Sequence, residues 1–205
     1  MRDAPGRRYA GRTATERATD RRRAFLDAGL ELFGTRAYDE VSVADLVAES
    51  GQTRRSFYEL FDDREGLLLA VHDEVVAGQV RAIVEAAGDP PASLRAADRA
   101  TRAFVDYYAQ DSRRAHVQYV AVVGVSRAME EHRRRMFRTI AARLGEWLGP
   151  AAGDDGPARR RSALAFSGAV SELLMDWLWA QDEPLEAIRD EVLALLRARF
   201  FPAPA

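Results

Sequence analysis

Arginine is the residue type in this sequence whose chemistry is most distinctive. All 30 basic residues of the Lys/Arg class are arginines, because the chain contains no lysine. The planar guanidinium group donates two parallel hydrogen bonds, a geometry that fits a phosphate or the edge of a guanine base. Eight arginines fall within the first 25 residues, against three acidic residues. The formal net charge of -2 nevertheless argues against a protein that coats nucleic acid indiscriminately.

Groups that catalyse reactions or bind metals are scarce. The chain has no cysteine, which excludes disulfides, thiolate zinc sites and cysteine nucleophiles. His72, His116 and His132 have no metal-ligand spacing, and residues 130–132 lack the second histidine of a zinc-binding helix. We find neither a glycine-rich phosphate loop nor a nucleophile elbow. The sequence therefore predicts no enzyme, no cofactor and no metal site, with the histidines in structural or surface roles.

Composition and hydropathy are those of a globular protein outside the membrane. Hydrophobic residues make up 47% of the chain, and the mean hydropathy is -0.31. The longest apolar runs, such as 67–71 and 119–123, are far shorter than the roughly 20 residues that a membrane span needs. The arginine-rich N-terminus lacks the apolar segment of a secretory signal. We expect a cytoplasmic protein that does not bind membranes.

Apolar residues recur at helical spacing along most of the chain, and no stretch alternates with the period of a strand. Residues 1–15 show no such periodicity, so we interpret them as a mobile basic arm. The sequence Gly88-Asp89-Pro90-Pro91 is the clearest linker. An all-α fold is therefore predicted. The expected helices run from about 16 to 34–37, from 43 to 50–51, over about 54–61, from 63 to about 87, and over about 92–110, 113–123, 126–148, 158–180 and 184–200.

Two short helices joined by a glycine turn follow the first long helix. Ser42 and Asp45 have the spacing of a capping box, and Gly51 permits the left-handed conformation of a tight turn. Thr53 is the expected cap of the next helix, and Asp62 with Glu65 has the spacing of another cap. This succession is the helix-turn-helix plan.

The same segment resembles the TetR family of bacterial transcriptional regulators. The first two helices of that family are similar to residues 25–33, Tyr38 and 41–51 of this chain. Its recognition helix is similar to residues 53–61, and the start of its fourth helix is similar to residues 64–67. The resemblance covers about residues 21–71. It implies a three-helix DNA-binding domain over 16–63, followed by a helical effector-binding and dimerisation domain over 64–205.

The resemblance also implies which residues contact DNA. Four would bind phosphates: Ser42, Thr53, Tyr58 and Arg64. Three in the first turn of the recognition helix would reach base edges: Arg54, Arg55 and Ser56. Phe57 and Phe61 would lock that helix onto the core. Taken singly, Ser42 and Thr53 are equally explained as helix caps, and Tyr58 as a half-buried core residue.

The middle helices, by the same resemblance, would enclose a pocket for a small-molecule effector. The candidate lining residues are Phe104, Tyr108, His116, Tyr119, Phe166 and Asp176. Gln118 is a further polar candidate for orienting a ligand. The last two helices carry broad apolar sectors, which either close the core of one chain or pair with a second copy in a four-helix dimer interface.

These inferences lead to one expected function. We expect a homodimeric repressor that binds double-stranded DNA at a palindromic operator and is released by a small-molecule effector. Two alternatives remain open at this point. One is a DNA-binding dimer without a small-molecule effector, and the other is an all-helical enzyme.

Overall fold

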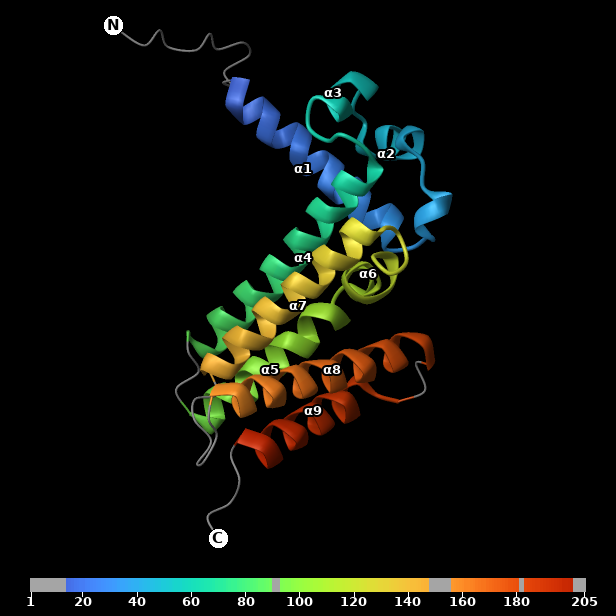
Figure 1. The fold of residues 1–205 in the computed structure, drawn as a ribbon. Helices are drawn as coiled ribbons and strands as arrows, with labels where there is room; N and C mark the ends of the chain where they lie inside the picture. Colours follow the sequence, from blue (N-terminus) through green and yellow to red (C-terminus); the bar gives the residue numbers. More distant parts are fainter. Residues whose placement is uncertain (1–13, 90–92, 148–155, 181–182, 201–205) are drawn as a thin grey trace, which may run out of the picture.

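The computed structural model describes residues 14–89, 93–147, 156–180 and 183–200 of the chain (Figure 1). Within these ranges the regular structure is helical throughout, which confirms the predicted all-α class. The elements are α1 (Ala14–Phe33), η1 (Tyr38–Glu40), α2 (Val43–Ser50), α3 (Arg54–Tyr58), α4 (Arg64–Ala87), α5 (Leu94–Ala109), α6 (Ser112–His116), η2 (Val117–Ala121), α7 (Arg127–Trp147), α8 (Gly156–Ala180) and α9 (Leu185–Phe200). Most of the predicted basic arm, residues 1–13, lies outside the described ranges.

Three phenylalanines pack α3 against α1. Phe25 of α1 and Phe57 of α3 are completely buried, and their rings meet edge to face with centroids 5.4 Å apart. Phe61 follows α3 and packs against both rings. Edge-to-face contacts favour a fixed ring geometry in addition to the burial of apolar area. The predicted role of Phe57 and Phe61 in locking α3 to the core is confirmed.

Two predicted caps are confirmed. The Ser42 hydroxyl accepts a hydrogen bond from the Asp45 backbone N–H, and the Asp45 carboxylate accepts one from the Ser42 N–H, which completes the capping box of α2. Gly51 ends α2 in the left-handed region with φ 63°. At the start of α3, the Thr53 hydroxyl accepts a hydrogen bond from the Ser56 N–H.

The predicted cap of α4 is wrong by one residue. Asp63, and not Asp62, caps this helix, and its carboxylate accepts a hydrogen bond from the Gly66 N–H at 2.8 Å. Glu65 is free for another role and accepts a hydrogen bond from the Ser126 hydroxyl at the start of α7. The error arises because three acidic residues fall within four positions, and the turn after α3 decides which of them precedes the first helical residue.

α4 is the helix that joins the two halves of the molecule. It packs against α1 near its beginning and against α5 over much of its length, and α7 runs beside it (Figure 1). α8 and α9 lie next to each other at the end of the molecule away from α2 and α3 (Figure 1). No helix in the described part of the chain is both long enough and apolar enough to cross a bilayer.

The apolar sectors of α8 and α9 are largely used within the chain. Five of their members are almost fully buried: Val170, Leu174, Ile188, Val192 and Leu196. Partly buried members, Leu173 and Trp177 among them, pack against the edge of the core. The sequence left two roles open for these apolar sectors, the core of one chain and a dimer interface. Closing the core of one chain accounts for much of the pattern.

Two glycines set the close approach of α4 to its neighbours. A Cβ atom on Gly29 of α1 would lie 2.7 Å from the Val71 Cγ2 atom of α4. On the other side, a Cβ atom on Gly78 of α4 would overlap the hydroxyl of Tyr107, which donates a hydrogen bond to the Val75 carbonyl. Both contacts exist because the glycines carry no side chain.

We predict that Gly29→Ala lowers the free energy of unfolding by about 1–3 kcal/mol, the typical cost of overpacking. Alanine raises helix propensity by about 1 kcal/mol, but Val71 is 2% exposed and stiff at χ1, so it cannot move aside freely. Gly145→Ala is the matched control, because the nearest atom there lies 3.6 Å from the new Cβ. Urea unfolding should show Gly145→Ala to be at least as stable as the parent. If Gly29→Ala and Gly145→Ala stabilise the protein equally, the packing argument is contradicted.

Candidate DNA-binding surface and internal cavity

α3 presents basic and aromatic side chains to solvent. The Arg55 side chain is 90% exposed, Tyr58 is 51% exposed, and Arg54 is exposed without a hydrogen bond or ion pair among the described residues. The Arg55 Nε atom lies 2.9 Å from the Glu59 Oε1 atom, one helical turn later. An exposed pair of this kind contributes little to stability, so Arg55 can exchange its partner at small cost. The surface of α3 is therefore suited to binding an anion or a base edge.

The hydroxyl groups at the starts of α2 and α3 are already hydrogen-bonded. Thr53 Oγ1 and Ser56 Oγ lie 2.9 Å apart, and the Ser42 hydroxyl donates to the Asp45 carboxylate. The hydrogen bonds from Ser42 lower the pKa of Asp45. Ser42 and Thr53 thus serve as caps in this structure, which is the alternative that the sequence left open, and the Ser56 hydroxyl is hydrogen-bonded to the Thr53 cap. A phosphate contact would be an additional role for these exposed groups.

Arg64 has a structural role that the sequence did not reveal. Its guanidinium group donates hydrogen bonds to the carbonyls of Tyr38, at 3.1 Å, and Val41, at 2.8 Å. The same group lies over the Tyr38 ring, 4.2 Å from its centroid. Only 32% of the side chain is exposed. Arg64 therefore links the start of α4 to the turn before Ser42 through these hydrogen bonds.

A cavity of about 230 Å³ lies between the helices of the second half. Predominantly apolar side chains from α4, α5, η2, α7, α8 and α9 line it. Four of the residues predicted for a pocket are among them: Phe104, Gln118, Tyr119 and Phe166. Further lining residues, including Val76, Gln79, Val80 and Ile83, follow one face of α4 at helical spacing. The helical spacing of apolar residues on α4 is present in the sequence, but it does not distinguish the wall of a cavity from a filled core.

The polar groups at this cavity are few and mostly buried. Burial raises the pKa of Tyr119 to about 12, although hydrogen bonds with Tyr108 and Ser171 partly oppose the shift. The Tyr108 hydroxyl is buried behind the cavity and donates to the Gln79 Oε1 atom at 3.1 Å. The Gln118 Oε1 atom is buried without a hydrogen-bond partner among the described residues. A ligand that donates a hydrogen bond would satisfy it.

Two residues predicted for the pocket lie elsewhere. The His116 Nδ1 atom is 3.0 Å from the Phe33 carbonyl, which places this imidazole at the C-terminal end of α1. Asp176 is exposed and does not line the cavity. The sequence placed both residues on helices near the cavity but did not show which way the side chains face.

Comparisons with known proteins agree with this architecture. Residues 25–71 match the family model described as bacterial regulatory proteins, tetR family. The match spans α1 from Phe25, both short helices and the start of α4. The helix-turn-helix segment of the chain is therefore of the TetR type. The predicted resemblance is therefore confirmed.

Solved structures of TetR-family proteins share the fold over almost the whole chain. A protein from Syntrophomonas wolfei, described as a TetR-family transcriptional regulator, has a TM-score of 0.75 and 18% identity, covering 91% of this chain and 98% of that one. FadR from Bacillus subtilis, solved in complex with stearoyl-CoA, has a TM-score of 0.74 and 17% identity, covering 85% of this chain and 96% of that one.

SmeT, the repressor of a multidrug efflux pump of Stenotrophomonas maltophilia, gives a TM-score of 0.68 and 17% identity, covering 87% of this chain and 91% of that one. No curated protein sequence matches the chain significantly. At these identities the structural likeness establishes the fold alone.

We predict that the free energy of unfolding of this protein falls as pH rises from 10 to about 12, and falls less steeply in Tyr119→Phe. Because burial raises the pKa of Tyr119 from 10 to about 12, its contribution is complete below pH 10 and is lost as pH approaches 12. Lysine and cysteine are absent from the chain, so the other side chains that titrate near pH 10 are tyrosines, and the comparison with Tyr119→Phe isolates the contribution of this one.

Urea unfolding at a series of pH values measures this slope. Tyr58→Phe is the control, because that ring is 51% exposed and should leave the slope as in the parent. Identical slopes for the parent and Tyr119→Phe would show that the Tyr119 hydroxyl is not held in its neutral form by burial.

Proposed function

We propose that the chain is a homodimeric repressor that binds a palindromic DNA operator and is released from it by a small apolar effector. The observation that carries the proposal is the surface of α3, where Arg54, Arg55 and Tyr58 are exposed on a helix that Phe57 anchors in the core. Rigid anchoring with exposed arginines is what base recognition in a major groove requires. The fold and family of a transcriptional regulator support it.

The proposed contacts divide into two kinds. Arg54, Arg55 and Ser56 would reach base edges, and an arginine that binds guanine with two hydrogen bonds contributes about 1–3 kcal/mol of discrimination. Ser42, Thr53, Tyr58 and Arg64 would contact phosphates, which fix the register of the protein on DNA. Arg64 would do so while it holds the turn before Ser42, so part of its effect would be indirect. We place the boundary between the DNA-binding domain and the effector domain at residues 63 and 64.

A second copy of the chain would pair through α8 and α9. Trp179 near the end of α8 is 71% exposed, which is unusual for so large an apolar ring in a monomer. Leu173 and Trp177 are only partly covered by their own chain. A two-fold axis at this end would present two copies of α3 to successive major grooves, about 34–36 Å apart.

The cavity supports the effector part of the proposal. Its lining is mainly apolar, and an apolar protein cavity of about 150 Å³ is enough to hold benzene. A cavity of about 230 Å³ would therefore hold a molecule of roughly ten heavy atoms. α4 lines this cavity and also packs against α1, so a ligand that displaces α4 would change the position of the DNA-binding domain.

We predict that selection from random-sequence DNA yields a palindrome with the parent protein, and that Arg54→Ala with Arg55→Ala loses or relaxes it. Losing both base contacts should weaken binding to the selected site at least tenfold, since 1.4 kcal/mol corresponds to a factor of ten. Light scattering should give twice the chain mass of 22.8 kDa for both proteins.

The matched control is the pair Arg127→Ala with Arg135→Ala on α7. It removes the same charge from exposed sites, and the Arg127–Glu131 pair at 3.0 Å repeats the spacing of Arg55 and Glu59. The control should select the parental palindrome. A folded dimer that enriches no DNA sequence would exclude the regulator and favour an all-helical enzyme or a protein-binding role.

We predict that small alkylbenzenes or alcohols of up to about ten heavy atoms raise the thermal unfolding midpoint and weaken operator binding by about 5–150-fold, the usual range of allosteric coupling. Val170→Phe should abolish both effects, because Val170 lines the cavity and is 5% exposed. Val123→Phe makes the same change at a site that is 57% exposed and should respond like the parent. Operator binding that no such compound alters would instead support the dimer without a small-molecule effector.

A further inference from the structure

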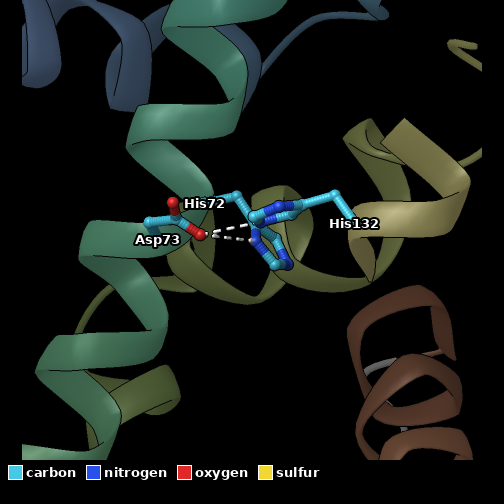
Figure 2. Close-up of side chains that lie close together, drawn as sticks. All are labelled: His72, Asp73 and His132. Carbon is cyan, nitrogen blue, oxygen red and sulfur yellow. Dashed lines mark hydrogen bonds and ion pairs between the residues drawn. The ribbon is translucent and has the colours of Figure 1, made fainter. Parts of the chain in front are cut away.

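Two histidines and an aspartate from distant parts of the sequence meet between α4 and α7 (Figure 2). His72 and Asp73 are neighbours on α4, and His132 reaches them from α7. The His132 Nε2 atom is 2.8 Å from the Asp73 Oδ1 atom, and the His72 Nδ1 atom is 3.8 Å from the same oxygen. One ligand atom from each of the three side chains lies within 4.8 Å of the other two.

An ordinary interhelical hydrogen bond accounts for only part of this arrangement. It explains His132 and Asp73, but it leaves out His72, whose side chain is 1% exposed. Neither ring nitrogen of His72 has a hydrogen-bond partner among the described residues. A buried imidazole without partners is costly, because each polar atom has lost its contact with water. Figure 2 shows both imidazoles grouped around the same carboxylate oxygen.

A shared cation would satisfy all three groups. A tetrahedral metal ion holds nitrogen and oxygen ligands at about 2.0–2.1 Å, so its ligand atoms lie about 3.4 Å from each other. The two nitrogen–oxygen separations of 2.8 Å and 3.8 Å bracket that value, and the two imidazole nitrogens lie within 4.8 Å of each other, so side-chain shifts would bring the three ligand atoms around one ion. Imidazole ligands select Zn²⁺, Co²⁺, Ni²⁺ or Cu²⁺, whereas Mg²⁺ and Ca²⁺ prefer oxygen.

We propose that His72, Asp73 and His132 form a binding site for a divalent transition-metal ion of the Zn²⁺ class. The Asp73 side chain is 49% exposed and His132 is 20% exposed, so the cation can enter from solvent and keep a water molecule as its fourth ligand. On binding, the His132 Nε2 atom exchanges its hydrogen bond to Asp73 for a bond to the metal, and this imidazole carries its proton on Nδ1.

The site lies where it would stiffen the connection between the two halves. α7 is joined to α4 by the Ser126–Glu65 and His132–Asp73 contacts, and a metal ion would add a third attachment at His72. The next residue on α4, Glu74, lies 3.6 Å from the Arg23 guanidinium of α1. Metal binding would therefore hold α4 fixed beside the DNA-binding domain. This consequence for operator affinity rests on the proposed function, whereas the metal site does not.

The test titrates untagged, chelator-treated protein with Zn²⁺ by calorimetry and with Co²⁺ by visible absorption, in the absence of DNA. We expect saturation at one ion per chain in the parent. His132→Gln and Asp73→Asn should each weaken binding more than tenfold, because each removes a ligand. His116→Gln is the matched control, since this third histidine bonds to the Phe33 carbonyl outside the cluster. Circular dichroism confirms that each variant is folded.

Loss of binding in the two cluster variants, with full binding in His116→Gln, would establish the site. Absence of saturable binding in the parent, or equal binding in all four proteins, would overturn it. Affinity for the selected operator with and without Zn²⁺ then tests the coupling separately. A protein that binds Zn²⁺ as expected but selects no DNA sequence would contradict the proposed function and leave the metal site in place.

Discussion

The packing of one helix against two neighbours is the constraint on which the rest of this structure depends. α4 must approach α1 closely enough to cover Val71, and α5 closely enough for the Tyr107 hydroxyl to reach the Val75 carbonyl. Both approaches depend on a glycine, Gly29 on α1 and Gly78 on α4 itself. Through these contacts α4 is packed in both halves of the chain. Because a packed helix moves as a rigid body more easily than it bends, a displacement of α4 in one half is carried to the other.

Local features of the fold were predictable because local chemistry determines them. The caps at Ser42 and Thr53 need only a hydroxyl group and a backbone N–H three residues later, and both are confirmed. The cap of α4 was assigned to the wrong acid, because Asp62, Asp63 and Glu65 all suit the start of a helix. Only the path of the chain after α3 selects Asp63. The 3₁₀ turn at η1 was not predicted. The helix predicted over 113–123 is divided into α6 and the π-helix η2, because apolar spacing does not show where the hydrogen-bonding pattern changes.

Side-chain partners that are distant in sequence could not be predicted. His72 and His132 are separated by a linker and two intervening helices, so no spacing rule relates them. Arg64 was identified as a basic residue at a helix start, but its bonds to the Tyr38 and Val41 carbonyls depend on where η1 lies. Phe104, Tyr119 and Phe166 were placed near a common pocket by resemblance, whereas the directions of His116 and Asp176 required the packed structure.

The proposed cavity and the proposed metal site would act on the same helix from different positions. Val76 and Gln79 of α4 line the cavity, and His72 and Asp73 lie about one turn earlier on α4, next to the residues Val71 and Glu74 that face α1. A ligand in the cavity can change DNA binding only by as much as its affinity differs between two positions of α4. A metal ion would likewise act by favouring one of those positions. It would add to the effect of the ligand if both prefer the same position of α4, and would oppose that effect if they prefer different ones.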